Sequence, residues 1–191
     1  MMMQKKHIKN LLTTLSKHFH RTIIVAVMIS VSPQLAAQLC SKNDTPETIS
    51  PSNYKSDIPG ELTDIRINNN NLTWRRCLHG QQWNNTNQSC TGSPIKLNWQ
   101  DALLAAKNSG WRLPNTKELM SIVDLQCFSP PLHPELFPEA PASLTSGLWT
   151  STPLQTKINS SETAAWTIGL GHGKLRHQAI NLLNFVIFVK N

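Results

Sequence analysis

The segment WRLPNTKEL, residues 111–119, gathers side chains that could do chemistry. Arg112 and Glu118 are a cation and a carboxylate in the same short stretch, and Asn115 lies between them. Such residues could act on a substrate, bind a ligand, or form a joint within the fold. Asn115 is a good helix N-cap, and Glu118 stands where its carboxylate can accept a hydrogen bond from the backbone N–H of the cap. We therefore interpret both as the start of a helix rather than as catalysts.

The other residues of this segment also have structural roles. Pro114 favours an extended conformation at Leu113, and Trp111 and Leu113 alternate as in a strand that faces the core. Arg112 points the opposite way, where it could pair with an acidic residue, Glu118 or Asp124, or face a ligand. The predicted structural motif consists of Trp111, Arg112, Leu113, Pro114, Asn115 and Glu118.

A second group of candidate residues lies in GHGKLRH, residues 171–177. The GHGK turn is typical of a β-hairpin, so Lys174 and Arg176 share one strand face, with His172 at the turn. Cations that cluster in this way could bind a polyanion. A solvated hairpin without a ligand is the alternative. We take His172, Lys174 and Arg176 as the candidate ligand-binding residues.

The start of the chain has the order of a secretory signal. Five basic residues and no acidic ones lie in the first 37, with the apolar stretch TIIVAVMISV and small residues at Ala36 and Ala37. That stretch is about ten residues long, whereas a membrane span needs about twenty. We predict a signal peptide over residues 1–37 and an exported protein in the periplasm, on the cell surface or secreted, with no membrane span after cleavage. An uncleaved anchor is the alternative.

The net charge of the exported chain is small. Of the 18 basic residues, 13 follow the predicted signal, against 11 acidic residues, so the net charge is +2. No run of Lys or Arg is among them, which argues against nucleic-acid binding.

All four cysteines, Cys40, Cys77, Cys90 and Cys127, follow the predicted signal. An even number in an exported chain predicts two disulfides. Of the three possible pairings we favour Cys77–Cys90, which closes a short loop, with Cys40–Cys127 tying down the N-terminal segment. Zinc is the competing interpretation, but no C-x-x-C and no closely spaced pair of histidines is present. We predict no metal site.

Catalytic motifs are missing from the sequence, which has no nucleophile elbow, phosphate loop or dinucleotide fingerprint. Because the cysteines are assigned to disulfides, we predict no catalytic residues and no cofactor.

The remaining pattern predicts an α+β fold. Residues 38–59 are polar and read as an extended lead-in, and the domain covers residues 60–191. It begins with a hairpin whose turn contains the asparagines 68–71, followed by a cysteine-bounded loop with Trp83 packed inside it. We expect one helix over 99–108, which Asn98 can cap, and a second from Asn115 that carries Ile122 and Val123 on its apolar face. A proline-rich ordered loop follows over 128–146, and then come three strands, GLWTSTP, AAWTIGL and LNFVIFVKN.

These segments together resemble the Lcl C-terminal domain family. The resemblance runs from Gly60 to Lys190, and its most specific element is WRLPN…EL. It is carried in chain order by LTWRRC, GQQW, WQDALLAA, WRLPNTKEL, SIVDLQC, LWTSTP, AAWTIGLGHGKL and VIFVK. It implies a C-type-lectin-like single domain with two short helices, antiparallel β-strands and long loops. Two features depart from the family pattern: Asn71 replaces a glycine, and VIFVK, residues 186–190, lacks the family's arginines.

The resemblance also implies a function. The family is named after a collagen-like adhesin whose C-terminal domain is implicated in binding sulfated glycosaminoglycans. We therefore expect an exported, non-catalytic binding module for glycans or another surface polymer. A structural or accessory subunit that docks to an envelope protein is the alternative. An enzyme related to the formylglycine-generating enzymes, which have a related fold, is a third hypothesis.

Overall fold

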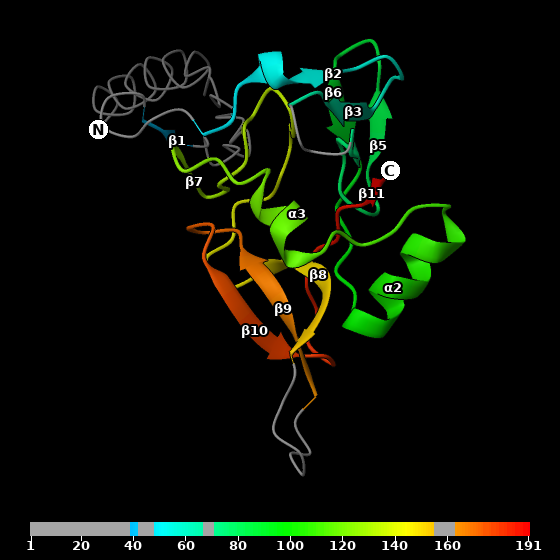
Figure 1. The fold of residues 1–191 in the computed structure, drawn as a ribbon, viewed down its shortest axis with the longest axis vertical. Coiled ribbons are helices and arrows are strands. Elements are labelled where there is room, and N and C mark those ends of the chain that lie inside the picture. Colours follow the sequence, from blue (N-terminus) through cyan, green and yellow to red (C-terminus); the bar gives the residue numbers. More distant parts are fainter. Residues whose placement is uncertain (1–38, 42–47, 67–70, 155–162) are drawn as a thin grey trace, which may run out of the picture. The chain divides into compact units, whose positions relative to one another are not determined.

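A computed structural model describes residues 39–41, 48–66, 71–154 and 163–191 (Figure 1). The chain divides into two units, Met1–Leu35 and Ala36–Asn191, and the described residues all belong to the second. The predicted signal peptide, residues 1–37, and most of the predicted asparagine turn lie outside the described residues. Within the described ranges, no helix has the length and apolar character of a membrane span.

The architecture of the described residues is α+β, as predicted, with antiparallel sheets and two α-helices (Figure 1). A four-stranded sheet has the order β11-β4-β3-β2, a three-stranded sheet has the order β10-β9-β8, and the pairs β1–β7 and β5–β6 complete the strands. The elements are β1 (Leu39–Cys40), η1 (Pro51–Asn53), β2 (Tyr54–Lys55), β3 (Glu61–Asp64), β4 (Thr73–Arg75), β5 (Gln82–Asn84), β6 (Ser89–Thr91), α2 (Trp99–Asn108), α3 (Thr116–Met120), β7 (Cys127–Phe128), β8 (Gly147–Leu154), β9 (Ala164–Gly169), β10 (Leu175–Ala179) and β11 (Val189–Lys190).

Two hydrophobic clusters hold these layers together. Neighbouring residues of β8, Leu148 and Trp149, enter different clusters, because successive side chains of a strand point to opposite faces. The first cluster includes Leu119 of α3, and the second includes Ala102 and Ala106 of α2. The three-stranded sheet is therefore covered by packed side chains on both faces over β8.

Both helices begin at the predicted caps. The side chain of Asn98 accepts a hydrogen bond from the backbone N–H of Asp101 at 2.9 Å at the start of α2. α3 is shorter than predicted, because it ends at Met120 and leaves Ile122 and Val123 in the following turn. The hydroxyl of Ser121 donates to the carbonyl of Glu118 at 2.7 Å and caps this end. Ile122 and Val123 are buried nonetheless.

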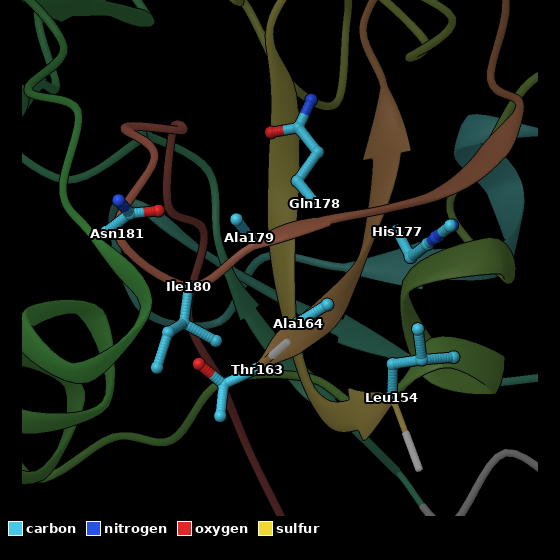
Figure 2. Close-up of a pocket in the computed structure, with 8 residues that line it drawn as sticks. All are labelled: Leu154, Thr163, Ala164, His177, Gln178, Ala179, Ile180 and Asn181. Carbon is cyan, nitrogen blue, oxygen red and sulfur yellow. The ribbon is translucent and has the colours of Figure 1, made fainter. Parts of the chain in front are cut away.

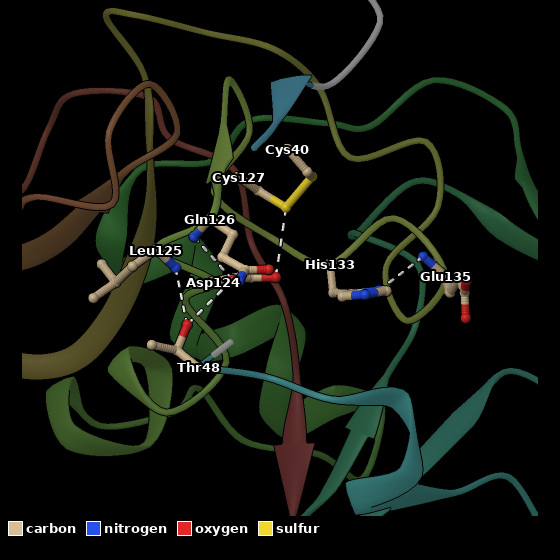
Figure 3. Close-up of a disulfide and its surroundings, with 8 residues drawn as sticks. All are labelled: Cys40, Thr48, Asp124, Leu125, Gln126, Cys127, His133 and Glu135. Carbon is tan, nitrogen blue, oxygen red and sulfur yellow. Dashed lines mark hydrogen bonds between the residues drawn. A yellow bond between two sulfur atoms is a disulfide. The ribbon is translucent and has the colours of Figure 1, made fainter. Parts of the chain in front are cut away.

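The lead-in is more firmly attached than its composition indicates. Ile49 is 0% exposed within the first cluster, and β2 extends the four-stranded sheet. The hydroxyl of Thr48 donates to the buried carboxylate of Asp124 at 3.1 Å and accepts from the backbone N–H of Leu125 at 3.0 Å (Figure 3). Residues 48–55 are thus part of the packed domain, which the sequence analysis places from residue 60 onward.

The disulfides join Cys77 to Cys90 and Cys40 to Cys127, which is the pairing favoured from the sequence. The first closes the β5–β6 hairpin region, and the second ties β1 to β7 (Figure 3). Trp83 does not pack inside the cysteine-bounded loop. It lies against Gly60 and Arg76, whose guanidinium is 4.0 Å from the centre of the indole ring. The prediction for Trp83 was wrong because its partners come from the preceding hairpin.

The proline-rich segment is an ordered loop, as predicted, with Leu132, Leu136 and Phe137 buried. Arg76 helps to fix it, since its guanidinium donates to the backbone carbonyls of Glu135 and Leu136. Burial lowers the pKa of Arg76 from its usual value.

The last predicted strand is mostly irregular, and only Val189–Lys190 forms a strand. Its backbone changes partner every few residues. The N–H of Phe185 donates to the carbonyl of Gly147, whereas the carbonyls of Val186 and Phe188 accept from the backbone N–H groups of His79 and Arg75, respectively. No single neighbour continues long enough to form a regular ladder. The apolar run is nevertheless buried throughout residues 185–189.

Candidate functional site

The candidate residues His172, Lys174 and Arg176 lie on the ribbon that β9 and β10 form. The backbone N–H of Gly169 donates to the carbonyl of Lys174 at 2.9 Å, which continues the ladder one residue before β10 begins. Lys174 and Arg176 therefore point to the same side, as predicted. His172 is exposed at the turn, and its ring lies edge-on against Phe128, with the ring centres 4.6 Å apart.

Lys174 and Arg176 are exposed cations. In the part of the chain that the structure describes, ion pairs join Arg66 to Asp64, Arg112 to Glu118 and Lys190 to Glu61, and neither Lys174 nor Arg176 takes part in one. The guanidinium of Arg176 lies over Gly169, 3.6 Å from the position that a Cβ atom there would occupy. Its charge is therefore directed along the surface of the sheet and is available to a ligand.

β10 also presents unpaired backbone groups. It is an edge strand, since β9 is its partner on one side and no other described strand pairs with it. The hydrogen bonds of Lys174 and Ile180 to β9 show that the even-numbered residues turn their backbone groups inward. Leu175 and His177 accordingly turn their N–H and C=O groups outward, about 7 Å apart along the strand, whereas the outward carbonyl of Ala179 accepts from the backbone N–H of Leu182 at 3.0 Å. The edge thus combines free hydrogen-bond donors with two cations.

A hollow of about 600 Å³ lies at the far end of the same strand. In Figure 2, Ala164 and Ala179 occupy the middle of its lining, with His177 and Leu154 on one side and Ile180 and Asn181 on the other. Thr163 and Gln178 complete the lining. No lysine, arginine, aspartate or glutamate is among the eight lining residues.

The WRLPNTKEL corner forms a closed polar network. The side chain of Asn115 accepts from the backbone N–H of Glu118 at 2.9 Å, and the backbone N–H of Asn115 donates to the Glu118 carboxylate at 2.8 Å. Arg112 donates to both oxygens of that carboxylate, at 2.7 and 2.9 Å, and to the side chain of Asn191. The predicted capping box is confirmed. Of the alternatives left open for Arg112, the structure selects the pair with Glu118.

The electrostatics of this corner agree with a structural role. Burial alone would raise the pKa of Glu118, but the hydrogen bonds from Arg112 and from the backbone of Asn115 outweigh it and lower the pKa. The carboxylate is held in its charged form, which does not suit a general acid at neutral pH. A hollow of about 590 Å³ does border Arg112 and Glu118, but the hydrogen bonds above occupy these charged groups.

Comparison with known proteins identifies the family. The model of the Lcl C-terminal domain family matches residues 64–190. The chain belongs to the Lcl C-terminal domain family. No curated protein matches the chain. No solved structure matches it either, so the C-type-lectin-like assignment stays a prediction.

The two departures from the family pattern have different consequences. Asn71 has a φ of 53°, so it supplies the positive φ expected at the family's glycine position. In VIFVK, Ile187 is fully buried. Lys190 pairs with Glu61 at 2.8 Å, and its ammonium lies 4.3 Å from the centre of the Trp111 ring. The cation at the end of this Lcl C-terminal domain is thus engaged within the fold.

The sequence analysis missed the hollow. No sequence pattern links Ala164 to Ala179, because they meet only through the register of β9 and β10. His177 stood in the quoted GHGKLRH segment, but nothing in the sequence linked it to Asn181. Among the described residues of this Lcl C-terminal domain, no group of three or more His, Cys, Asp or Glu side chains is placed to hold a metal ion.

Proposed function

We propose that the chain is an exported, non-catalytic module that binds an anionic polymer, in particular a sulfated glycan, along the open edge of β10. The observation that supports this most directly is the pair of exposed cations, Lys174 and Arg176, which take part in no ion pair among the described residues. The two disulfides are compatible with export.

The geometry of the edge suits sulfate groups. Sulfate oxygens accept hydrogen bonds both from a guanidinium and from backbone N–H groups, and bonds to charged partners are the stronger ones. The outward N–H of Leu175 lies between Lys174 and Arg176 in the chain, so one anion can contact a cation and a backbone donor together. A linear polymer can then repeat the contact at the next outward N–H, that of His177.

Charged edge strands also have a second explanation. Natural proteins place charged side chains on edge strands to prevent pairing with strands of other chains. Either sign of charge serves that purpose, whereas polyanion binding requires a positive charge. Charge reversal therefore separates the two explanations.

The decisive variant is Lys174→Glu/Arg176→Glu, tested for binding to heparin in about 0.1 M salt. We expect the affinity to fall at least tenfold, because two attractive charges become repulsive at a distance shorter than the Debye length of about 10 Å. The wild-type affinity should also weaken as salt is added. The control is Lys55→Glu/Lys117→Glu, which reverses two exposed lysines on β2 and α3 and should retain heparin binding within a few-fold.

Folding is monitored in the same variants. The exposed positions should leave the free energy of unfolding within about 0.5 kcal/mol of the wild type, and the oligomeric state should not change because the reversed edge still carries charge. Unchanged heparin affinity in a folded Lys174→Glu/Arg176→Glu protein would overturn the proposal.

The same open edge favours a second candidate function, docking to an envelope protein. An edge strand can pair with an extended segment of another protein through its backbone groups. If the folded protein binds no sulfated glycan but co-purifies with a defined envelope protein, this candidate replaces the first.

A further inference from the structure

We propose that the hollow at the end of β10 binds a neutral sugar residue, through its ring, at a site separate from the cations. We call this lining, Leu154, Thr163, Ala164, His177, Gln178, Ala179, Ile180 and Asn181, the β10 hollow. The inference rests on the proposed function in one respect, because the ligand is taken to be part of a glycan.

The floor of the β10 hollow follows from the strand register. Ala179 is paired with Ala164, which is paired in turn with Leu154 on β8. Directly paired residues point to the same face of a sheet. Two methyl groups therefore lie side by side where larger side chains would fill the space. Such a floor can contact the C–H groups on one face of a sugar ring.

The rim supplies polar groups at the edge of this floor. His177 and Asn181 are exposed, and no hydrogen bond of their side chains, or of the Thr163 hydroxyl, is found among the described residues. The imidazole of His177 lies edge-on to Trp166, with the ring centres 5.9 Å apart. The indole therefore positions the imidazole beside the floor. These groups can donate to and accept from sugar hydroxyls.

The walls of the β10 hollow are held in place by the fold. The backbone N–H of Ile180 donates to the carbonyl of Thr163 at 3.1 Å, and the carbonyl of Ile180 accepts from the backbone N–H of Trp99 at 3.0 Å. Ile180 also packs against the second hydrophobic cluster. A site that is formed before the ligand arrives loses less entropy on binding.

The lining selects the chemical class of the ligand. Because it contains no charged side chain, a charged group would enter without a compensating partner. An acyl chain would cover the floor but leave the polar rim without hydrogen bonds. A sugar ring satisfies both, since it has an apolar face and hydroxyls around its edge. The volume of about 600 Å³ lies within the range usual for small-molecule sites.

The alanine floor of the β10 hollow and the cations lie on opposite faces of one strand. Lys174 and Arg176 are even-numbered residues of the alternating strand, whereas His177 and Ala179 are odd-numbered. Charge recognition and ring recognition can therefore be removed independently. High salt removes the first and leaves the second, since the Debye length falls to about 3 Å at 1 M.

The test uses the exported protein with both disulfides formed and a panel of immobilised neutral oligosaccharides of glucose, galactose, mannose and N-acetylglucosamine in about 1 M NaCl. We expect at least one to bind and Ala179→Trp, which fills the space above the floor, to reduce that binding tenfold or more. Asn181→Ala, which removes a rim group, should reduce it about three- to tenfold. Both positions are exposed, so the variants should fold.

Two matched controls accompany these variants. Leu175→Trp adds the same side chain to the same face of β10 but outside the lining, and it should retain binding within about twofold. Lys174→Glu/Arg176→Glu should also retain binding at this salt concentration. Unchanged binding in Ala179→Trp, or equal losses in Ala179→Trp and Leu175→Trp, would overturn the inference.

Heparin binding in about 0.1 M salt shows which of the two proposals fails. Heparin binding without any neutral oligosaccharide binding overturns only the β10 hollow as a sugar site. Neutral oligosaccharide binding without heparin binding overturns only the polyanion site. Loss of both in a folded protein overturns both.

Discussion

The WRLPNTKEL corner and the β9–β10 ribbon have similar residues and opposite surroundings. Each contains an arginine and other polar residues within a short stretch. In the corner, Arg112, Asn115 and Glu118 satisfy one another through hydrogen bonds of 2.7 to 2.9 Å. In the ribbon, Arg176 and Lys174 take part in no ion pair with any described residue.

This difference shows that the type of a residue does not by itself determine its role. A dense group of charged and polar side chains in a sequence can indicate a functional site. In the corner, however, the hydrogen bonds of these side chains start a helix and fix a turn. The ribbon has fewer notable residues but keeps its donors and charges free. Exposed charges without a partner in the fold are therefore the better indication of a binding site. Substitutions in the corner should lower stability, and those in the ribbon should lower binding.

The largest expected effect concerns a leucine from each region. Leu113 is 2% exposed and Leu175 is 42% exposed. We expect Leu113→Ala to lower the free energy of unfolding by about 2–5 kcal/mol, because it leaves a cavity in the second cluster. Leu175→Ala should change it by less than about 0.5 kcal/mol. Urea unfolding of both variants measures this, and equal losses would remove the contrast between the two regions.

Much of the fold follows from local sequence signals. Asn98 and Asn115 mark both helix starts, since each side chain caps the helix that follows it. The hairpin turn before Lys174 and the irregular proline-rich loop were also predicted correctly. These features depend on residues close together in the chain, which is why the sequence alone reveals them.

The features that sequence analysis missed depend on distant partners. Ile49 lies in a polar stretch and is buried because β2 joins the sheet. The apolar run 185–189 looks like one strand, but its hydrogen bonds go to several neighbours in turn. The β10 hollow exists because two alanines on different strands are in register. No local pattern carries this information, because tertiary contacts decide it.

A smaller effect is expected from two asparagines, one in each region. Asn115→Ala removes the side chain that caps α3 and should lower the free energy of unfolding by about 0.5–2 kcal/mol. Asn181→Ala, on the rim of the β10 hollow, should change it by less than about 0.5 kcal/mol, because no hydrogen bond of that side chain is found among the described residues. A glycan-binding loss in a folded Asn115→Ala protein, with Asn181→Ala unaffected, would reverse the assignment of the two regions.

The smallest expected effect is a pH dependence in the corner. The folded state lowers the pKa of Glu118, so this carboxylate contributes stability at pH values above its unfolded pKa of about 4.3, and the contribution is lost as pH falls through the folded pKa. We expect Glu118→Gln to lower the free energy of unfolding by less than about 1 kcal/mol at pH 7, since the pair with Arg112 is partly exposed. The difference from the wild type should shrink at about pH 3, because this pH lies below the unfolded pKa and protonation of the wild-type carboxylate then favours the unfolded state. Urea unfolding at both pH values measures it, with the exposed Glu135→Gln as a control that should stay within about 0.5 kcal/mol of the wild type. A difference that grows on acidification would mean that the charge of Glu118 opposes folding, and the corner would then be a strained site rather than a closed joint.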